Sequence, residues 1–333
     1  VVQNGTVDTG AKSIEHGQTG TFNLIPEVSG TTATVTCTND QTGTILNNVL
    51  TVSNVTNDTT CTVKYVTEMT TLYTDGTLII NENLANRSSN ITTHGAVTNE
   101  YDAMDETNSY VFSSDTSMPW NSEKTSVTSV EIGSNIKPVS TAYWAYNLTN
   151  MTTGDFTKLD TSQVTSMYYM FYEAGYNAST FNLTGLNNWD TSSVTSMYRM
   201  FFQAGYNATT FDIGDLSRWD TSSVTNMSSM FNAAGRSATT WTIGDLSRWD
   251  TSSVTNMNNM FNYTGYNATT FNIGDLSGWN TSSVTNMSYM FYYAGYRATW
   301  SLDCRSWNVN KVTSYSNFNT GVTSKVTAPT WVN

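Results

Sequence analysis

The feature that most constrains this chain is a sequence that recurs every 30 residues in its second half. Segments that read close to Trp-Asp-Thr-Ser-Ser-Val-Thr-Asn-Met-Ser-Ser-Met-Phe begin at Lys158, Asn188, Arg218, Arg248 and Gly278. A fixed period of this length indicates units that cannot bury their own apolar face and must stack on their neighbours. We therefore expect a five-coil repeat solenoid over residues 156–320.

The apolar positions inside each repeat predict its interior and its local structure. Residues 209–213 alternate as a short strand does, whereas Val224 to Phe231 place apolar side chains at the spacing of a short helical or 3₁₀ turn. We expect one short strand and one short helical turn in each coil, and a mainly β chain. The predicted structural ladder consists of Trp189, Trp219, Trp249, Trp279, Met200, Met230, Met260 and Met290.

Glycines and aspartates also recur once per repeat. Gly205, Gly235, Gly265 and Gly295 follow the predicted helical turn and are expected to end it, since glycine tolerates positive φ. Asp190, Asp220 and Asp250 are expected to cap a turn with their carboxylates. A second aspartate series, Asp215, Asp245 and Asp275, has calcium binding as an alternative to turn capping, but one carboxylate per coil is few for a calcium site. Turn capping is the preferred interpretation, and no metal site is predicted.

The first 66 residues have a different sequence pattern. Short segments of alternating apolar and polar residues are separated by turn residues at the spacing of a β-sandwich. We expect an Ig-like β-sandwich over 1–66, and its segments resemble bacterial Ig-like modules that serve as spacers. Cys37 and Cys61 are predicted to form a disulfide, the alternative being two separately buried thiols. Cys304 has no neighbouring histidine in the sequence and is expected to be a buried thiol.

Three further segments complete the predicted organisation. Residues 67–126, with a hairpin through Asp75-Gly76, are expected to cap the N-terminal end of the solenoid, because a stack of coils exposes an apolar cross-section. Residues 127–155 resemble a degenerate first coil. The last unit, residues 297–318, is shorter and loses both methionines, as expected of a C-terminal cap, and residues 321–333 form a tail.

Composition and charge exclude several classes of function. Charged residues make up 12% of the chain, and the formal net charge is -12 with no cluster of lysine or arginine, which argues against nucleic acid and membrane surfaces as partners. We find no apolar run of the length that spans a bilayer. With two histidines and no recognisable nucleophile, phosphate-loop or metal motif, we predict neither an enzyme nor a cofactor. The chain begins at Val1, so we expect an N-terminal segment such as a signal peptide to precede it.

The positions that change between repeats are the candidate binding residues. They are rich in tyrosine, serine and asparagine, which give contact area and adaptable hydrogen bonding at low entropic cost. The alternative is a solvent-exposed face whose sequence varies between repeats without any role in binding. The predicted binding residues are Tyr168, Tyr169, Tyr198, Arg199, Phe202, Asn258, Asn259, Tyr263, Tyr289, Tyr292 and Tyr293. The series Tyr176, Tyr206, Tyr266 and Tyr296 is expected to pack between coils, with a platform for sugar rings as the alternative.

The Trp-Asp-Thr-Ser-Ser-Val-Thr-Asn-Met units resemble the BspA-like leucine-rich-repeat surface proteins, a family whose repeat is known from mycoplasma lipoproteins. The resemblance implies an extracellular or cell-surface protein of bacteria or their phages, with adhesion as the usual role. We therefore predict a secreted or surface-displayed protein that binds a host protein or glycan. The alternative is a self-assembling subunit of a surface layer, filament or phage fibre, whose partners are copies of itself.

Overall fold

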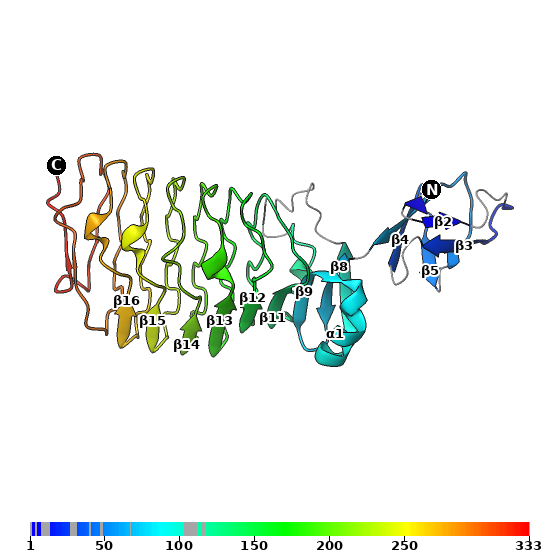
Figure 1. The fold of residues 1–333 in the computed structure, drawn as a ribbon, viewed down its shortest axis with the longest axis horizontal. Coiled ribbons are helices and arrows are strands. Elements are labelled where there is room, and N and C mark those ends of the chain that lie inside the picture. The colour runs from blue at the N-terminus through cyan, green and yellow to red at the C-terminus, as the bar shows by residue number, and fades with distance from the viewer. Residues whose placement is uncertain are drawn as a thin grey trace. The chain divides into compact units, whose positions relative to one another are not determined.

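The computed structural model describes residues 2–3, 5–7, 14–26, 32–39, 41–46, 49–66, 68–102, 112, 114 and 117–332 (Figure 1). The chain divides into two compact units. The first comprises Val1–Met69 and Glu82–Thr93, and the second comprises Thr70–Asn81 and His94–Asn333. Strands far outnumber helices in both, which confirms the predicted mainly β class. The finer domain boundaries stay predictions.

Short strands form two sheets in the first unit. One has the order β1 (Val2–Gln3), β7 (Cys61–Val66) and β4 (Thr32–Cys37). The other has the order β2 (Gly5–Val7), β3 (Gly20–Pro26), β6 (Val49–Val52) and β5 (Gly43–Leu46). Leu24, Leu50, Val52 and Val63 are buried together and form a small core. Because alternate side chains of a strand face one side, the alternating sequence produces this one-sided burial. The assignment to the Ig-like class stays a prediction.

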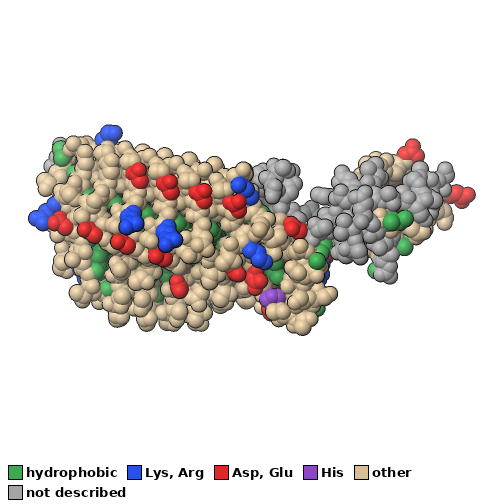
Figure 2. All heavy atoms as spheres, in the orientation of Figure 1, with side chains coloured by type: hydrophobic (Ala, Val, Ile, Leu, Met, Phe, Trp, Pro, Cys, Tyr) green, Lys and Arg blue, Asp and Glu red, His purple; other side chains and the backbone are tan. Residues whose placement is uncertain are grey.

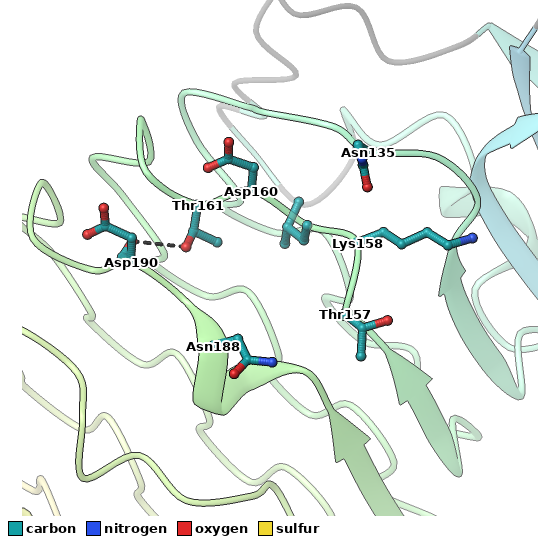
Figure 3. A pocket seen from close by; sticks show the side chains of 8 residues that line it. Asn135, Thr157, Lys158, Asp160, Thr161, Asn188 and Asp190 are labelled. Carbon is teal, nitrogen blue, oxygen red and sulfur yellow. Dashed lines mark hydrogen bonds between the residues drawn. The ribbon is translucent and has the colours of Figure 1, made fainter.

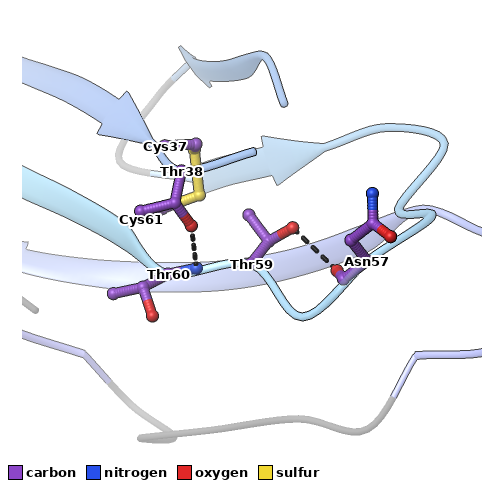
Figure 4. The surroundings of a disulfide bond; sticks show 6 residues. All are labelled: Cys37, Thr38, Asn57, Thr59, Thr60 and Cys61. Atoms are coloured by element: carbon purple, nitrogen blue, oxygen red, sulfur yellow. Dashed lines mark hydrogen bonds between the residues drawn. A yellow bond between two sulfur atoms is a disulfide. The ribbon is translucent and has the colours of Figure 1, made fainter. Parts of the chain in front are cut away.

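Cys37 and Cys61 lie opposite each other where β4 and β7 begin to pair (Figure 4). Their Sγ atoms are 2.01 Å apart in a disulfide. Beside the bridge, the backbone N–H of Thr60 donates to the hydroxyl of Thr38 at 3.0 Å. The bridge therefore joins two strands that are also held by the hydrogen bonds of the sheet. Cys304 is fully buried, as predicted, and burial raises the pKa of its thiol.

Removing the disulfide is expected to weaken the first unit selectively. The chain-entropy estimate for a link across a separation of 24 residues is up to about 3 kcal/mol. The double variant Cys37→Ala, Cys61→Ala should unfold at lower urea than the parent in the first unit, while the transition of the repeats stays in place. Cys304→Ala is the control, because it changes a cysteine of the second unit and should leave the transition of the first unit in place. Superimposable first-unit transitions for the parent and the double variant would contradict a stabilising bridge.

A β-hairpin opens the second unit. β8 (Glu68–Tyr73) and β9 (Thr77–Asn83) are neighbours in one sheet, and Gly76 turns between them with φ 87°. The hairpin predicted at Asp75-Gly76 is thus confirmed. η1 (Leu84–Asn86) and α1 (Arg87–His94) come next in the chain and belong, apart from His94, to the first unit. β10 (Val97–Asp102) and η2 (Asn121–Glu123) follow in the second unit. β10 lies outside β8, whereas β9 pairs in parallel with β11 (Ser129–Ile132). β9 therefore links the antiparallel hairpin to the parallel strands of the repeats.

From β11 onward successive repeats stack on one another and pair in parallel. The strands follow in chain order along one edge of the stack: β12 (Thr153–Asp155), β13 (Thr180–Thr184), β14 (Thr210–Asp212), β15 (Thr240–Thr242) and β16 (Thr270–Asn272) (Figure 1). Further along the chain, β17 (Leu302–Asp303) pairs in parallel with β18 (Val326–Thr327). Phe181 lies opposite Phe211, and Trp241 lies opposite Phe271. A second line of parallel bridges joins Ser166, Ser196, Asn226, Asn256, Asn286 and Ser314. The 30-residue period of the sequence is therefore the length of one coil.

The Trp-Asp-Thr motif ties each coil to both of its neighbours. The indole ring of Trp219 stacks on that of Trp189 at 5.9 Å between centroids, and its Nε1–H donates to the Leu186 carbonyl of the preceding coil at 2.8 Å. The hydroxyl of Thr221 donates to the Asp250 carbonyl of the following coil at 2.9 Å. The structure places all eight residues of the predicted ladder in the interior, each no more than 5% exposed.

The segment from Val224 to Phe231 is not the helical turn that its apolar spacing predicted. The N–H of Met230 donates to the Met227 carbonyl and closes a β-turn, whereas the next N–H, that of Phe231, donates across to Met260 of the following coil. An α-helix would instead direct every N–H to the carbonyl four residues back in the same chain. A 3₁₀-helix is also excluded, because Ser229 has φ 55° and both helix types require a negative φ. Short helical turns occur elsewhere in the coil, at η3 (Leu186–Asn188), η4 (Leu246–Arg248) and η5 (Leu276–Gly278).

The glycine after this segment does not end a helix, because none is present there. Gly235 has φ 51°, and a Cβ atom built on it would lie 2.8 Å from Cγ of Phe211 and 2.8 Å from Cδ1 of Trp241. Gly205, Gly265 and Gly295 have the same backbone sign and similarly close aromatic neighbours. The recurring glycine is therefore required both by its conformation and by the close approach of the aromatic interior.

Candidate binding surface

The predicted binding residues lie on the chain of β-turns that runs from coil to coil. We call the variable side chains there the tyrosine stripe. It comprises residues 168–169 and 172–173 with their equivalents one to four repeats later, and the series Tyr176, Tyr206, Arg236, Tyr266 and Tyr296. Backbone hydrogen bonds such as Tyr169 N–H to Tyr198 O (3.0 Å) and Arg199 N–H to Ser228 O (3.0 Å) hold equivalent positions side by side. Ten of the eleven predicted residues are half-buried, and Tyr289 is 37% exposed.

Aromatic rings crowd the first part of the tyrosine stripe. Tyr172 stacks on Phe202 with centroids 4.8 Å apart and on Tyr146 at the same distance. Tyr143 stacks on Tyr169 at 5.3 Å and shares a hydroxyl hydrogen bond with Tyr168. Tyr143, Tyr146 and Tyr172 were not among the predicted binding residues. An aromatic residue at the variable position of Tyr172, and two tyrosines just before the first regular repeat, were the available signals.

A second aromatic group occupies the last repeats. Tyr263 stacks on Tyr293 at 5.3 Å with an angle of 3° between the rings, and Tyr266 stacks on Tyr296 at 5.1 Å. Between the two groups lies a coil with small side chains, in which Ser228, Ser229 and Ala233 are all at most 4% exposed. The tyrosine stripe thus consists of two aromatic groups separated by a coil of small residues.

The stacking of the rings determines which of their atoms a ligand can contact. When two rings lie face to face, each covers a face of the other, so their edges and phenolic hydroxyls remain for contact. Tyr176 and Tyr206 stack in this way at 4.8 Å, which matches the packing interpretation of that series. The tyrosine stripe is therefore a surface for hydrogen bonding by ordered hydroxyl and amide groups rather than a flat platform of open ring faces.

Two arginines sit among these rings. Nη1 of Arg199 donates to the Tyr169 hydroxyl at 3.1 Å, and its guanidinium carbon lies 5.1 Å from the centroid of Tyr198. The guanidinium of Arg236 lies 4.8 Å from the centroid of Tyr266 and 5.3 Å from that of Tyr206. Cation–π attraction of this kind holds both charges in place.

Carboxylates form rows elsewhere on the repeats, as Figure 2 shows. Asp160, Asp190, Asp220 and Asp250 each accept a hydrogen bond from the backbone N–H two residues later, at 2.9 to 3.0 Å. Asp215, Asp245 and Asp275 do the same at 2.9 Å. The preferred turn-capping interpretation is confirmed for both series. Among the described residues, no three His, Cys, Asp or Glu side chains gather as a metal site would require.

Acid is expected to destabilise the repeats through these caps. Hydrogen bonds from the side chain and backbone of Ser222 lower the pKa of Asp220, and serines do the same for Asp160, Asp215 and Asp250. A lowered pKa means that the folded state binds the proton more weakly, so the stabilisation is complete above the unfolded value of about 4 and is lost as the pH falls below it.

Urea midpoints measured from pH 6 down to about pH 2.5 should therefore fall below about pH 4. Asp220→Asn provides a control, because Asn280 fills the equivalent position and accepts the same bond from Ser282 at 3.1 Å. The urea midpoint of this variant should fall less steeply as the pH is lowered. An identical pH profile would contradict a contribution from the Asp220 carboxylate.

A polar hollow of about 370 Å³ lies where the first aspartate row begins (Figure 3). Asn135, Thr157, Lys158, Leu159, Asp160, Thr161, Asn188 and Asp190 line it. The Lys158 side chain points away from Asp160 and Asp190, and its Nζ donates to the Gly133 carbonyl at 3.0 Å. Thr161 donates to the Asp190 carbonyl. These polar groups hold turns and adjacent coils together, and the hollow contains no paired nucleophile and base.

Comparison with known proteins places the repeats in a family. A family model described as "Mycoplasma protein of unknown function, DUF285" matches residues 139–241 and 206–331, together more than half of the chain. The chain belongs to this family. DUF285 is a BspA-like repeat family, so the predicted resemblance is confirmed at that level, and the match includes the whole tyrosine stripe. No curated protein and no solved structure matches the chain.

Proposed function

We propose that this DUF285 protein is a secreted or surface-displayed binding protein whose tyrosine stripe holds an extracellular ligand. The observation that supports this most is a contrast within each coil. The interior tryptophan recurs in the four repeats that begin at Asn188, Arg218, Arg248 and Gly278, and the methionines recur in all five. The neighbouring stripe positions instead change from Tyr-Arg at 198–199 to Ser-Ser at 228–229 and Asn-Asn at 258–259. Variation at ordered, half-buried polar and aromatic side chains is typical of adaptable binding surfaces.

The packing of the tyrosine stripe supports the same proposal energetically. A ring held between neighbours has already lost rotational freedom, so little more is lost when a ligand arrives. In this proposal the stacked repeats are a leucine-rich-repeat-like solenoid, and the first unit is an Ig-like spacer. BspA-like repeats are of a surface-protein type, which supports display outside the cell. No described helix is long and apolar enough to cross a membrane.

The alternative, a subunit that polymerises end to end, has less support. At the C-terminal end, Trp331 stacks on Tyr315 at 4.4 Å and meets Phe318 at 5.1 Å. Nζ of Lys325 also donates to the Gly295 carbonyl at 3.2 Å. These residues cover apolar rings and a carbonyl of the final coils, which another copy would otherwise have to cover.

The experiment replaces the stripe residues of one coil with those of another coil of the same protein. Tyr289→Ser, Tyr292→Asn and Tyr293→Ala together turn residues 288–293 into the Ser-Ser-Met-Phe-Asn-Ala of 228–233. The backbone accepts this change, because φ is 58° at Tyr289 and 55° at Ser229, and 53° at both Tyr293 and Ala233. On an array of extracellular proteins and glycans, we expect the parent to bind one class of ligand and the copied-coil variant to bind it about ten-fold more weakly.

A matched control changes the aspartate rows instead. Arg248→Gly and Asp250→Asn turn residues 248–250 into the Gly-Trp-Asn of 278–280. This variant should bind as the parent does. If both variants lose binding equally, or if neither loses any, the tyrosine stripe is not the binding surface.

A further inference from the structure

The tyrosine stripe carries two positive charges without a carboxylate partner, in a chain whose formal net charge is -12. Ion pairs among the described residues join Arg87 to Glu82, His94 to Asp75, Lys137 to Asp160 and Arg305 to Asp303. Arg199 and Arg236 are in none of them. Glu173 is the one acidic residue at a stripe position, so the tyrosine stripe has a formal charge of +1, from two arginines and one glutamate.

Arg199 is held in place but keeps unused donors. One nitrogen, Nη1, donates to the Tyr169 hydroxyl, and the rings of Tyr169, Tyr198 and Phe202 lie within 5.7 Å of the guanidinium carbon. Its Nε is buried without an acceptor, so it is out of reach of a ligand as well as of water. A guanidinium has five N–H donors, and those of Nη1 and Nη2 that the Tyr169 hydroxyl does not use are the ones left for an anion. The side chain therefore has a fixed orientation and spare donors that favour an incoming anion.

Arg236 replaces tyrosine in the series that runs through Tyr206 and Tyr266. The rings of Tyr206, Tyr263 and Tyr266 lie within 5.5 Å of its guanidinium carbon. Ring contacts of this kind fix the flat group and leave the N–H edges available for a bidentate partner. Arg199 and Arg236 belong to adjacent coils but stand at different positions within them, because the equivalent of Arg199 is Ser229, seven residues before Arg236. A single ligand that meets both must therefore be extended and cross the coils obliquely.

We infer that the ligand of the tyrosine stripe is an acidic polysaccharide, whose carboxylate or sulfate groups pair with Arg199 and Arg236. This inference rests on the proposed function and specifies its ligand class. The remaining stripe side chains suit such a chain, because phenolic hydroxyls, serines and asparagines are hydrogen-bonding partners for sugar hydroxyls. One coil spans about 4.8 Å along the stack, a length comparable to one sugar unit.

A polysaccharide fits the tyrosine stripe better than an acidic peptide does. Peptide recognition depends on an apolar anchor that enters a fully desolvated pocket. Among the described residues of the stripe, the large side chains with the greatest exposure are Tyr289 and Tyr296, at only 37% and 42%, and the other rings pack against one another. The aspartates of the two rows are not at stripe positions, and their field is screened over about 8 Å at physiological salt.

The test uses the full chain with heparin as the sulfated probe, polygalacturonate as the carboxylated probe, and dextran as the neutral probe. We expect one or both acidic probes to bind and dextran not to bind. Arg199→Gln with Arg236→Gln should weaken binding by about ten-fold or more, since two charge-assisted hydrogen-bonded contacts are lost. Arg199→Lys with Arg236→Lys should retain part of the affinity, because the charges remain. The difference between heparin and polygalacturonate identifies the anionic group.

The matched control is Arg218→Gln with Arg248→Gln, which removes two equal charges from outside the tyrosine stripe. Binding of the acidic probes should change by less than about two-fold. An equal loss in control and stripe variants would show non-specific attraction and overturn the inference. Poly-glutamate that binds as tightly as the polysaccharides would overturn the choice of ligand class. If dextran binds equally well, or no acidic probe binds, the inference fails, while a ligand lost in the copied-coil variant would still uphold the proposed function.

Discussion

Replacing Trp219 with alanine is expected to lower the free energy of unfolding of the repeats by about 3 to 5 kcal/mol. The side chain is 3% exposed and stacks between Trp189 at 5.9 Å and Trp249 at 6.2 Å. Truncation leaves a cavity in the middle of a continuous interior, and the rings on either side lose a stacking partner. The Leu186 carbonyl also loses the hydrogen bond from Nε1.

Urea unfolding followed by circular dichroism measures this effect. Trp219→Phe is the control, since it keeps an aromatic ring in the column but removes the donor to Leu186. It should cost less than the alanine variant, with about 1 kcal/mol expected from the lost hydrogen bond. A loss of less than about 1 kcal/mol for Trp219→Ala would contradict the interior role of the tryptophan column.

Gly235→Ala should cost about 2 to 5 kcal/mol, the sum of two separate effects. A left-handed backbone costs a residue with a Cβ about 1 to 2 kcal/mol, and forcing an atom into a packed interior costs about 1 to 3 kcal/mol. Gly235 has φ 51°, and the added Cβ would meet Phe211 and Trp241 at 2.8 Å. Neither ring can move freely, because the two rings stack on each other.

Gly214 provides the comparison that separates the two effects. It has φ 78°, but nothing lies within 4 Å of a Cβ atom placed on it. Gly214→Ala should therefore show the conformational cost alone, about 1 to 2 kcal/mol. Equal losses at the two positions, measured from thermal or urea unfolding, would contradict close packing of the aromatic interior against Gly235.

Much of the architecture could be predicted from the sequence because the repeat encodes it directly. A 30-residue period requires stacking, and the recurrence of Trp219 at Trp189 and Trp249 identifies an interior position. Asp220 before Ser222 is a local capping pattern, which needs no knowledge of the rest of the fold. The hairpin at Asp75-Gly76 was predictable for the same reason.

The chain of β-turns could not be distinguished from a helical turn. Apolar residues at Val224, Met227 and Met230 face inward in both cases, because both structures return to the same side after about three residues. The difference lies in the alternate N–H groups, such as that of Phe231, which bond to the next coil. A pairing between coils depends on the stack as a whole and leaves no local signal.

The candidate site was predictable as a set of positions but not as a geometry. Variation between repeats identified Tyr169, Arg199 and Tyr263, yet it could not show that the rings stack and expose their edges. It also could not show that Arg199 takes part in none of the ion pairs found among the described residues. Variation between repeats identifies the positions of the tyrosine stripe, whereas the proposal of a hydrogen-bonding, anionic ligand depends on the packing of the side chains.

A ligand can bind to the tyrosine stripe only if the stripe is not buried between copies of the chain. The assembly state of the purified chain, followed by light scattering and negative-stain imaging over a wide range of concentrations, distinguishes the two arrangements. We predict a monomer throughout, since Trp331 covers the last coil and the net charge of -12 opposes self-association. Ordered polymers that disappear in the copied-coil variant would contradict a stripe that is open to a ligand and make it a subunit interface.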